Sequence, residues 1–138
     1  MVSAEVRAAR EQLVRHHMEA ENAHDYAAAI ATFSHPRYEI IATDRTYDGL
    51  EEVQAYFRES RTAFPDQRNE LIALHHADDA VIVELWVLGT HKGPLLGIEP
   101  TGRSFRCRGT AFFVFRGRDL ICERVYFDSA TVLRQLTA

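Results

Sequence analysis

The region from Trp86 to Leu136 constrains the fold of this sequence most strongly. Two stretches with strand-like composition, residues 103–116 and 119–127, flank a short turn at Gly117 and Arg118, which is typical of a hairpin. A glycine- and proline-rich loop, residues 89–102, precedes them, and a short helical segment, residues 131–136, follows. Two long paired strands that lead into a helix favour a curved sheet with a hollow, where a small domain can hold a ligand.

The remaining sequence predicts helices first and further strands later. Residues 4–24 carry apolar or histidine side chains at helical spacing, at Val6, Ala9, Leu13, His17, Ala20 and His24. Helices are also expected over residues 26–33 and 50–63, and strands over 38–42, 69–76 and 80–88. This order predicts one α+β domain spanning residues 1–138, with three helices packed on a curved, mostly antiparallel sheet.

Composition argues against several classes of partner. The formal net charge is −4, which gives no electrostatic reason to expect nucleic-acid binding. No apolar run approaches the roughly 18 residues that a membrane span needs, so no membrane partner is expected. The first residues lack the basic and apolar segments of a signal peptide, which favours a cytoplasmic location.

Several short motifs, in order along the chain, resemble those of the SnoaL-like polyketide cyclases within the nuclear transport factor 2-like superfamily. The matching pieces are Tyr47-Asp48-Gly49-Leu50-Glu51, Ala63-Phe64-Pro65-Asp66, Trp86 with Gly89-Thr90-His91-Lys92-Gly93, Pro100-Thr101-Gly102-Arg103, and residues 123–128 leading into Leu133-Arg134-Gln135-Leu136. The resemblance implies a cone-shaped α+β barrel, open at one end, with an apolar cavity for a small hydrophobic molecule. It also implies a homodimer, and either a cyclase or isomerase that uses an acid/base carboxylate without a cofactor, or a protein that only binds ligands.

The last strand departs from the family pattern where the family cyclases carry their acid/base aspartate. Arg124 stands at the family's tryptophan position and Val125 at the adjacent aspartate position, while Asp128 matches a second family aspartate at the end of the strand. Either Asp128 takes the catalytic role, or the chemistry differs, or the protein catalyses no reaction. Strand alternation places Arg124 and Asp128 on one face, and the resemblance favours that face as the cavity lining. Asp128 can equally be the N-cap of the closing helix.

Glu84 is the alternative candidate for the base. Its place between apolar neighbours leaves three readings: a solvent-facing residue, a partner of an arginine such as Arg108, or a cavity acid with a raised pKa. The catalytic candidates are therefore Asp128 as acid/base, Arg124 as the oxyanion-binding group, and Glu84.

Five further residues are candidates for ligand binding: His17, Trp86, His91, Arg108 and Tyr126. His17 lies on the apolar stripe of the first helix, where it can aim into the cavity mouth or simply make a local hydrogen bond. Trp86 is expected in the core or the cavity wall, and His91 opens the glycine-rich loop. No cysteine and histidine spacing is typical of a zinc site, so no metal is expected.

Two hypotheses of function follow. In the first, a pocket carboxylate moves a proton next to a carbonyl and so catalyses cyclisation or isomerisation. In the second, the domain is a non-catalytic module for ligand binding or dimerisation.

Overall fold

The computed structural model describes residues 2–138, which form four α-helices, a short 3-10 helix and six strands. The helices are α1 (Ala4–Asn22), α2 (Tyr26–Ile30), η1 (Ile41–Thr43), α3 (Leu50–Ala63) and α4 (Ser129–Thr137). The strands are β1 (Arg37–Ile40), β2 (Arg45–Asp48), β3 (Arg68–His76), β4 (Ala80–Thr90), β5 (Ser104–Arg116) and β6 (Asp119–Phe127). The predicted helix over residues 50–63 and strand over residues 119–127 have the bounds that the structure shows.

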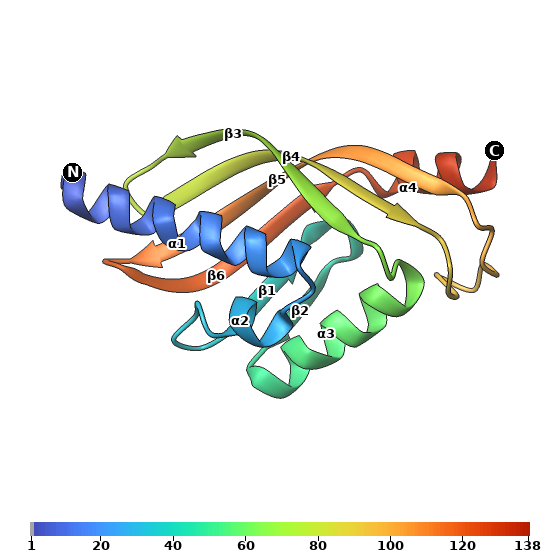
Figure 1. Cartoon of the computed structure of the whole chain (residues 1–138), viewed down its shortest axis with the longest axis horizontal. Coiled ribbons are helices and arrows are strands. Elements are labelled where there is room, and N and C mark those ends of the chain that lie inside the picture. The colour runs from blue at the N-terminus through green and yellow to red at the C-terminus, as the bar shows by residue number, and fades with distance from the viewer. Residues whose placement is uncertain (1) are drawn as a thin grey trace.

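The six strands form a single curved sheet in the order β2-β1-β6-β5-β4-β3 (Figure 1). Neighbouring strands are antiparallel except for β1 and β6, which run parallel, with Tyr38 opposite Glu123. The sheet is therefore mostly antiparallel, as expected. The parallel pair brings a strand from the first third of the chain beside the last strand.

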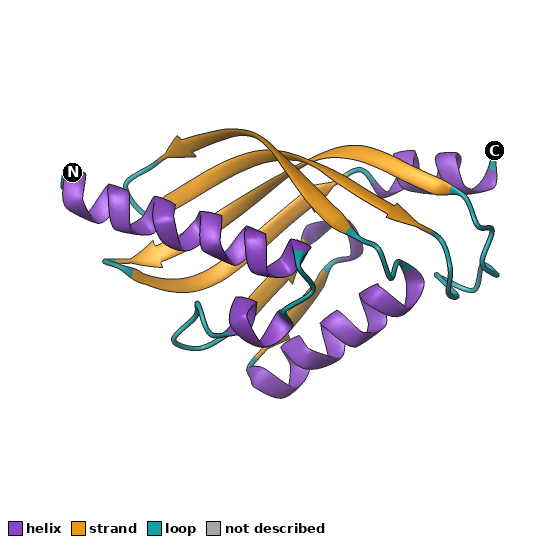
Figure 2. Ribbon diagram, viewed as in Figure 1, coloured by secondary structure: helices purple, strands orange, loops and turns teal. Residues whose placement is uncertain are grey.

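Helices α1, α2 and α3 lie on one side of the sheet, which we call the inner face (Figure 2). Strand alternation turns apolar side chains of β4 and β5 toward these helices, and they are almost fully buried: Val81, Val83, Leu85, Ala111 and Phe113. The helices bury their own apolar side chains against this face, including Val14, Met18, Val53 and Phe57. The opposite, outer face carries no helix across its centre (Figure 2). The predicted α+β class, with helices packed on a curved sheet, is confirmed.

The glycine-rich loop is fastened to the end of α3. The backbone N–H of Lys92 donates to the Ala63 carbonyl at 2.9 Å. A side chain at Gly93 would place its Cβ 2.2 Å from the Thr62 carbonyl oxygen, so only glycine permits this approach. Residues 91–103 thus begin beside the carboxyl end of α3.

No helix within residues 2–138 combines the length and the apolar character that crossing a bilayer requires.

Candidate active site

Four polar side chains meet inside the core, between α1 and the inner face of the sheet. His17 and Glu21 lie one turn apart on α1, so both point to the same side of the helix. Glu123 reaches them from the centre of β6, and Tyr38 from β1, the parallel neighbour of β6. All four residues are buried, and we call them the inner cluster.

His17 Nε2 lies between two carboxylates. It is 2.6 Å from Glu21 Oε1 and 2.8 Å from Glu123 Oε1. Only the Glu21 contact has hydrogen-bond geometry, so Nε2–H donates to Glu21, and the buried Glu123 Oε1 has no aligned donor among the described residues. The Tyr38 hydroxyl also donates to Glu21 Oε1, at 2.9 Å. Glu21 is therefore well satisfied as an anion, whereas Glu123 is not.

The other ring nitrogen shows that His17 is a cation. Nδ1 lies 2.8 Å from Thr32 Oγ1 and 3.2 Å from the Ala29 carbonyl oxygen. The Thr32 hydroxyl donates its own proton to the Ala29 carbonyl, at 2.6 Å, so both groups accept from Nδ1–H. With Nδ1 and Nε2 both donating, the ring is an imidazolium.

The pKa values in the inner cluster follow from burial and from these charges. Burial alone would lower the pKa of His17, but the charge of Glu21 and the contacts with both carboxylates outweigh it and raise that pKa to about 10. Burial favours a neutral Glu21, yet the His17 charge and hydrogen bond hold its pKa below the ordinary value. Burial, reinforced by the negative charge of Glu21, raises the pKa of Glu123 to about 7, against the opposing effect of His17. Glu123 is thus the carboxyl group that can take up or release a proton near neutral pH.

These pKa shifts predict that stability falls as the pH rises from about 5 to 9. The folded chain holds the Glu123 proton more tightly than the unfolded chain between the ordinary pKa of 4.5 and about 7. It holds the His17 proton more tightly from 6.5 up to about 10, so each contribution is lost as the pH rises through its window. Urea unfolding at a series of pH values measures this trend. The Glu123→Gln variant should lose the decline between pH 5 and 7 and keep the later one, whereas stability that rises over this range would contradict the assignment.

The same groups could hold a metal ion, because one ligand atom each from His17, Glu21 and Glu123 lie within 4.8 Å of one another. The distances from His17 Nε2 to the two carboxylates indicate that a proton, and not a metal ion, lies between these groups. Around a tetrahedral zinc with bonds of about 2.0–2.2 Å, neighbouring ligand atoms stand roughly 3.3 Å apart or more. The contacts of 2.6 and 2.8 Å to His17 Nε2 are instead hydrogen-bond distances. As it stands, the cluster is an acid/base arrangement.

Aromatic rings surround the inner cluster. Phe33 and Phe113 meet the His17 ring edge to face, with centroids 5.5 and 5.3 Å away. Further along β6, Val125 and Phe127 also point to the inner face, yet both remain only half-buried. The inner face is therefore apolar beside Glu123 and incompletely covered toward the end of β6.

The predicted Arg124 and Asp128 lie away from this cluster. The register places Arg124 opposite Phe112 on the outer face, so it does not point toward the inner cluster. Arg124 Nε donates to Glu39 Oε1 at 2.6 Å, and not to Asp128. Asp128 is the exposed N-cap of α4, accepting from the Ala130 N–H at 3.1 Å, which is the alternative that the sequence left open.

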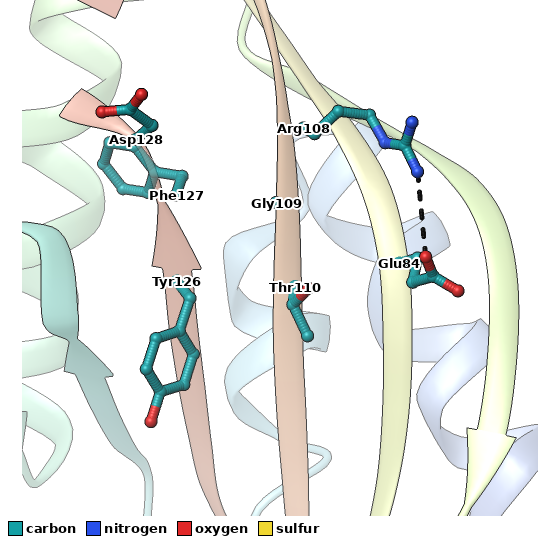
Figure 3. Close-up of a pocket in the computed structure, with 7 residues that line it drawn as sticks. All are labelled: Glu84, Arg108, Gly109, Thr110, Tyr126, Phe127 and Asp128. Atoms are coloured by element: carbon teal, nitrogen blue, oxygen red, sulfur yellow. Dashed lines mark ion pairs between the residues drawn. The ribbon is translucent and has the colours of Figure 1, made fainter. Parts of the chain in front are cut away.

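Glu84 and Arg108 form an exposed ion pair on the outer face (Figure 3). Their side chains come from the neighbouring strands β4 and β5, with Arg108 Nη2 3.7 Å from Glu84 Oε1. Glu84 also contacts His75 Nε2 at 2.8 Å. Of the three readings of Glu84, two are observed together: its side chain faces solvent and is the partner of an arginine. These two residues line an outer pocket together with Thr110, Tyr126 and Asp128.

Trp86 shares the outer face with Glu84 and is only half-buried, so it does not lie in the core, and a place in a cavity wall stays a prediction. The Arg106 guanidinium covers its ring, 3.6 Å from the centroid. Tyr126 is also on the outer face and is 40% exposed. His91 is fully buried at the start of the loop, where its Nδ1 accepts from the Thr101 N–H at 3.2 Å. Of the predicted residues, only His17 belongs to the inner cluster, and ligand binding by the others stays a prediction.

Sequence reasoning missed Glu21, Tyr38 and Glu123 as site residues. Glu21 carried a usable signal, because it follows His17 by one helical turn on the same apolar stripe. Glu123 carried a weaker signal. Strand alternation places it on the opposite face from Arg124 but does not show which of the two faces is buried. Nothing in the sequence distinguished Tyr38 from other tyrosines.

The fold resembles that of solved α+β proteins. A putative polyketide cyclase from Xanthomonas campestris is 20% identical, with a TM-score of 0.84, over 96% of this chain and 99% of that one. TsrD from Streptomyces laurentii is 26% identical, with a TM-score of 0.78, over 96% and 97%. A protein with a ketosteroid isomerase-like fold from Catenulispora acidiphila is 18% identical, with a TM-score of 0.77, over 89% and 90%. The fold is thus that of the nuclear transport factor 2-like proteins.

The family follows from the sequence itself. Residues 11–136 match the SnoaL-like polyketide cyclases, so this chain belongs to that family. Among curated proteins, none matches this sequence. The resemblance inferred from the short motifs is therefore confirmed for the family.

Proposed function

We propose that this protein is a cofactor-independent cyclase or isomerase of a small hydrophobic carbonyl compound, with Glu123 as the acid/base group. The observation that carries the proposal is the buried carboxyl of Glu123, whose pKa of about 7 lets it exchange a proton at neutral pH. Membership of the SnoaL-like polyketide cyclases supports a reaction of this class.

The proton transfer would proceed as follows. The ionised Glu123 carboxylate takes a proton from the carbon next to the substrate carbonyl, and the electron pair of that C–H bond moves to the carbonyl oxygen as an enolate. The enolate carbon then either forms a new bond to an electrophilic carbon or recovers the proton at another position. The His17 imidazolium, 2.8 Å from Glu123 Oε1, offsets the negative charge of the carboxylate before the transfer.

The substrate would lie on the half-buried inner face beside Glu123. Val125 and Phe127 offer apolar contacts there, because they follow Glu123 on the same face of β6. The apolar cavity that the family resemblance implies would lie there.

A second candidate is a non-catalytic module for ligand binding or dimerisation. The outer face favours it, because Tyr126 is exposed there beside Phe112, with ring centroids 5.7 Å apart. A second copy of the chain would cover such aromatic surface. The homodimer stays a prediction.

The titration of Glu123 tests the proposed role without knowledge of the substrate. Carbon-13 NMR of protein labelled at glutamate carboxyls should show one resonance that titrates near pH 7, and the Glu123→Gln variant should lose that resonance. An ordinary value near 4.5 for Glu123 would remove the basis of the proposal.

A further inference from the structure

Arg61, in the last turn of α3, places a cation in an aromatic environment close to the inner cluster. Its guanidinium carbon lies 5.5 Å from the ring centroid of Tyr26 and 5.2 Å from that of Phe57. These distances are those of cation–π contacts, which partly stabilise a desolvated guanidinium. The two rings are themselves stacked, with centroids 4.6 Å apart. Arg61 thus lies along one edge of an aromatic cluster.

The guanidinium has unused hydrogen-bonding capacity. Nη1 donates to Ser60 Oγ at 2.9 Å, whereas the buried Nε has no hydrogen-bond partner. Within residues 2–138, no carboxylate lies at ion-pair distance from Arg61. A buried donor without an acceptor is costly. The negative charge of Glu21 favours the charged guanidinium, although Glu21 lies beyond ion-pair distance. The free Nε–H, with the adjacent Nη group, forms the edge that binds a carboxylate through two parallel hydrogen bonds.

A chain of rings connects this cation to the acid/base group. The Tyr56 ring neighbours Phe57 and Tyr38, with centroids 5.3 Å away in each case. Tyr38 in turn contacts His17 and Glu21 through its hydroxyl. The electrostatics reflect this proximity. Burial, Glu21 and His17 have the largest effects on the pKa of Glu123, and the positive charge of Arg61 also lowers it.

We propose that Arg61 binds the carboxylate of an apolar organic acid, whose body lies along the Tyr26, Tyr56 and Phe57 rings toward Glu123. The inference rests on the proposed function and names its substrate class: a carbonyl compound that also carries a carboxylate. A single arginine matches the single charge of a carboxylate, and the aromatic walls match an apolar body. The residue would fix one end of the substrate while Glu123 acts on the other.

A binding measurement with a matched pair of probes tests this assignment. The probes are 4-oxo-4-phenylbutyrate and its neutral amide, which differ only in the charged end. Isothermal titration of the wild-type protein should show binding of the acid and much weaker binding of the amide. Arg61→Gln should weaken binding of the acid about tenfold or more, because a charge-assisted bidentate contact is lost. Arg61→Lys keeps the charge but lacks the planar guanidinium. Its affinity for the acid should lie between those of the wild type and Arg61→Gln.

Arg58 provides the matched control, since it lies on the same helix but is exposed to solvent. Arg58→Gln should leave the affinity for the acid unchanged. Thermal unfolding of Arg61→Gln should show a midpoint only slightly below that of the wild type, because the variant loses cation–π contacts but leaves no ion-pair partner behind. A large loss of stability would instead assign Arg61 a structural role and overturn the proposal.

Equal affinity of the wild type and Arg61→Gln for the acid would also overturn the proposal, and so would equal affinity of the wild type for the acid and the amide. A third contradicting result is no binding of the acid at about 10 mM, a concentration that detects even very weak complexes. Failure here is distinguishable from failure of the proposed function. The Glu123 titration is measured on the wild-type protein without a ligand, so a Glu123 pKa near 7 without Arg61-dependent binding would leave the acid/base role intact. Conversely, Glu123→Gln should still bind the acid.

Discussion

Replacing His17 by alanine should lower the free energy of unfolding by about 3–5 kcal/mol, because it leaves buried carboxyl groups without their cation. His17 is fully buried, and its imidazolium holds Glu21 at 2.6 Å and Glu123 at 2.8 Å. Without it, Glu21 must either keep an uncompensated charge in the core or take up a proton. Urea unfolding at pH 7 measures the change.

His75 offers a matched control on the outer face. It also contacts a glutamate, Glu84, at 2.8 Å, but its side chain is 56% exposed. Water solvates both partners there, so His75→Ala should cost about 1 kcal/mol or less. Similar losses in the two variants would show that burial does not set the strength of the His17 contacts. If His17→Ala fails to fold, His17→Gln, which retains a donor, should still be much less stable than His75→Ala.

Replacing Glu123 by glutamine should reduce the proton-transfer rate by about 10²- to 10⁴-fold, the usual contribution of a general acid or base. The amide is nearly isosteric with the carboxyl group but cannot accept a proton from carbon. Folding should persist, since burial already favours a neutral group at this position. The measurement is deuterium uptake next to the carbonyl of 4-oxo-4-phenylbutyrate in heavy water, followed by proton NMR.

Asp128→Asn is the informative comparison, because the last-strand motif predicted Asp128 as the acid/base group. The structure shows this side chain at the start of α4, where it accepts from the Ala130 N–H and from the Thr131 hydroxyl. The variant should keep the wild-type exchange rate and lose at most about 1 kcal/mol of stability, because asparagine is also a good N-cap. Loss of exchange in Asp128→Asn with normal exchange in Glu123→Gln would restore the sequence-based assignment. Equal rates in both variants and the wild type would favour the non-catalytic module.

Local patterns in the sequence were sufficient for most of the secondary structure, although the predicted helix over residues 26–33 ends at Ile30 and the predicted strand over 38–42 ends at Ile40. The helix over residues 50–63 follows from its apolar spacing, and the β5–β6 hairpin from two strand-like runs around Gly117, which has a positive φ of 60°. Asp25 caps α2 as its residue type predicts, accepting from the Ala28 N–H. These features depend on contacts between residues that are close in the sequence.

The site was harder to predict, because it depends on which face of β6 is buried. Alternation separates Arg124 from Glu123, but both faces of this strand mix polar and apolar side chains. The usual expectation that a glutamate faces solvent is wrong for Glu123, because α1 supplies a cation from more than one hundred positions earlier in the chain. Only the tertiary arrangement shows that His17 compensates this charge.

The parallel pairing of β1 with β6 affects how the chain folds during its synthesis on the ribosome. The hydrogen bond between Glu39 and Arg124 joins the two strands, and it can form only after the chain has been synthesised as far as Arg124, 85 positions later. Until then β1 and β2 form only a two-stranded ribbon, which is marginal in water by itself. Closure of such distant contacts is slow, so the nascent amino-terminal half stays exposed to chaperones and proteases until synthesis is nearly complete.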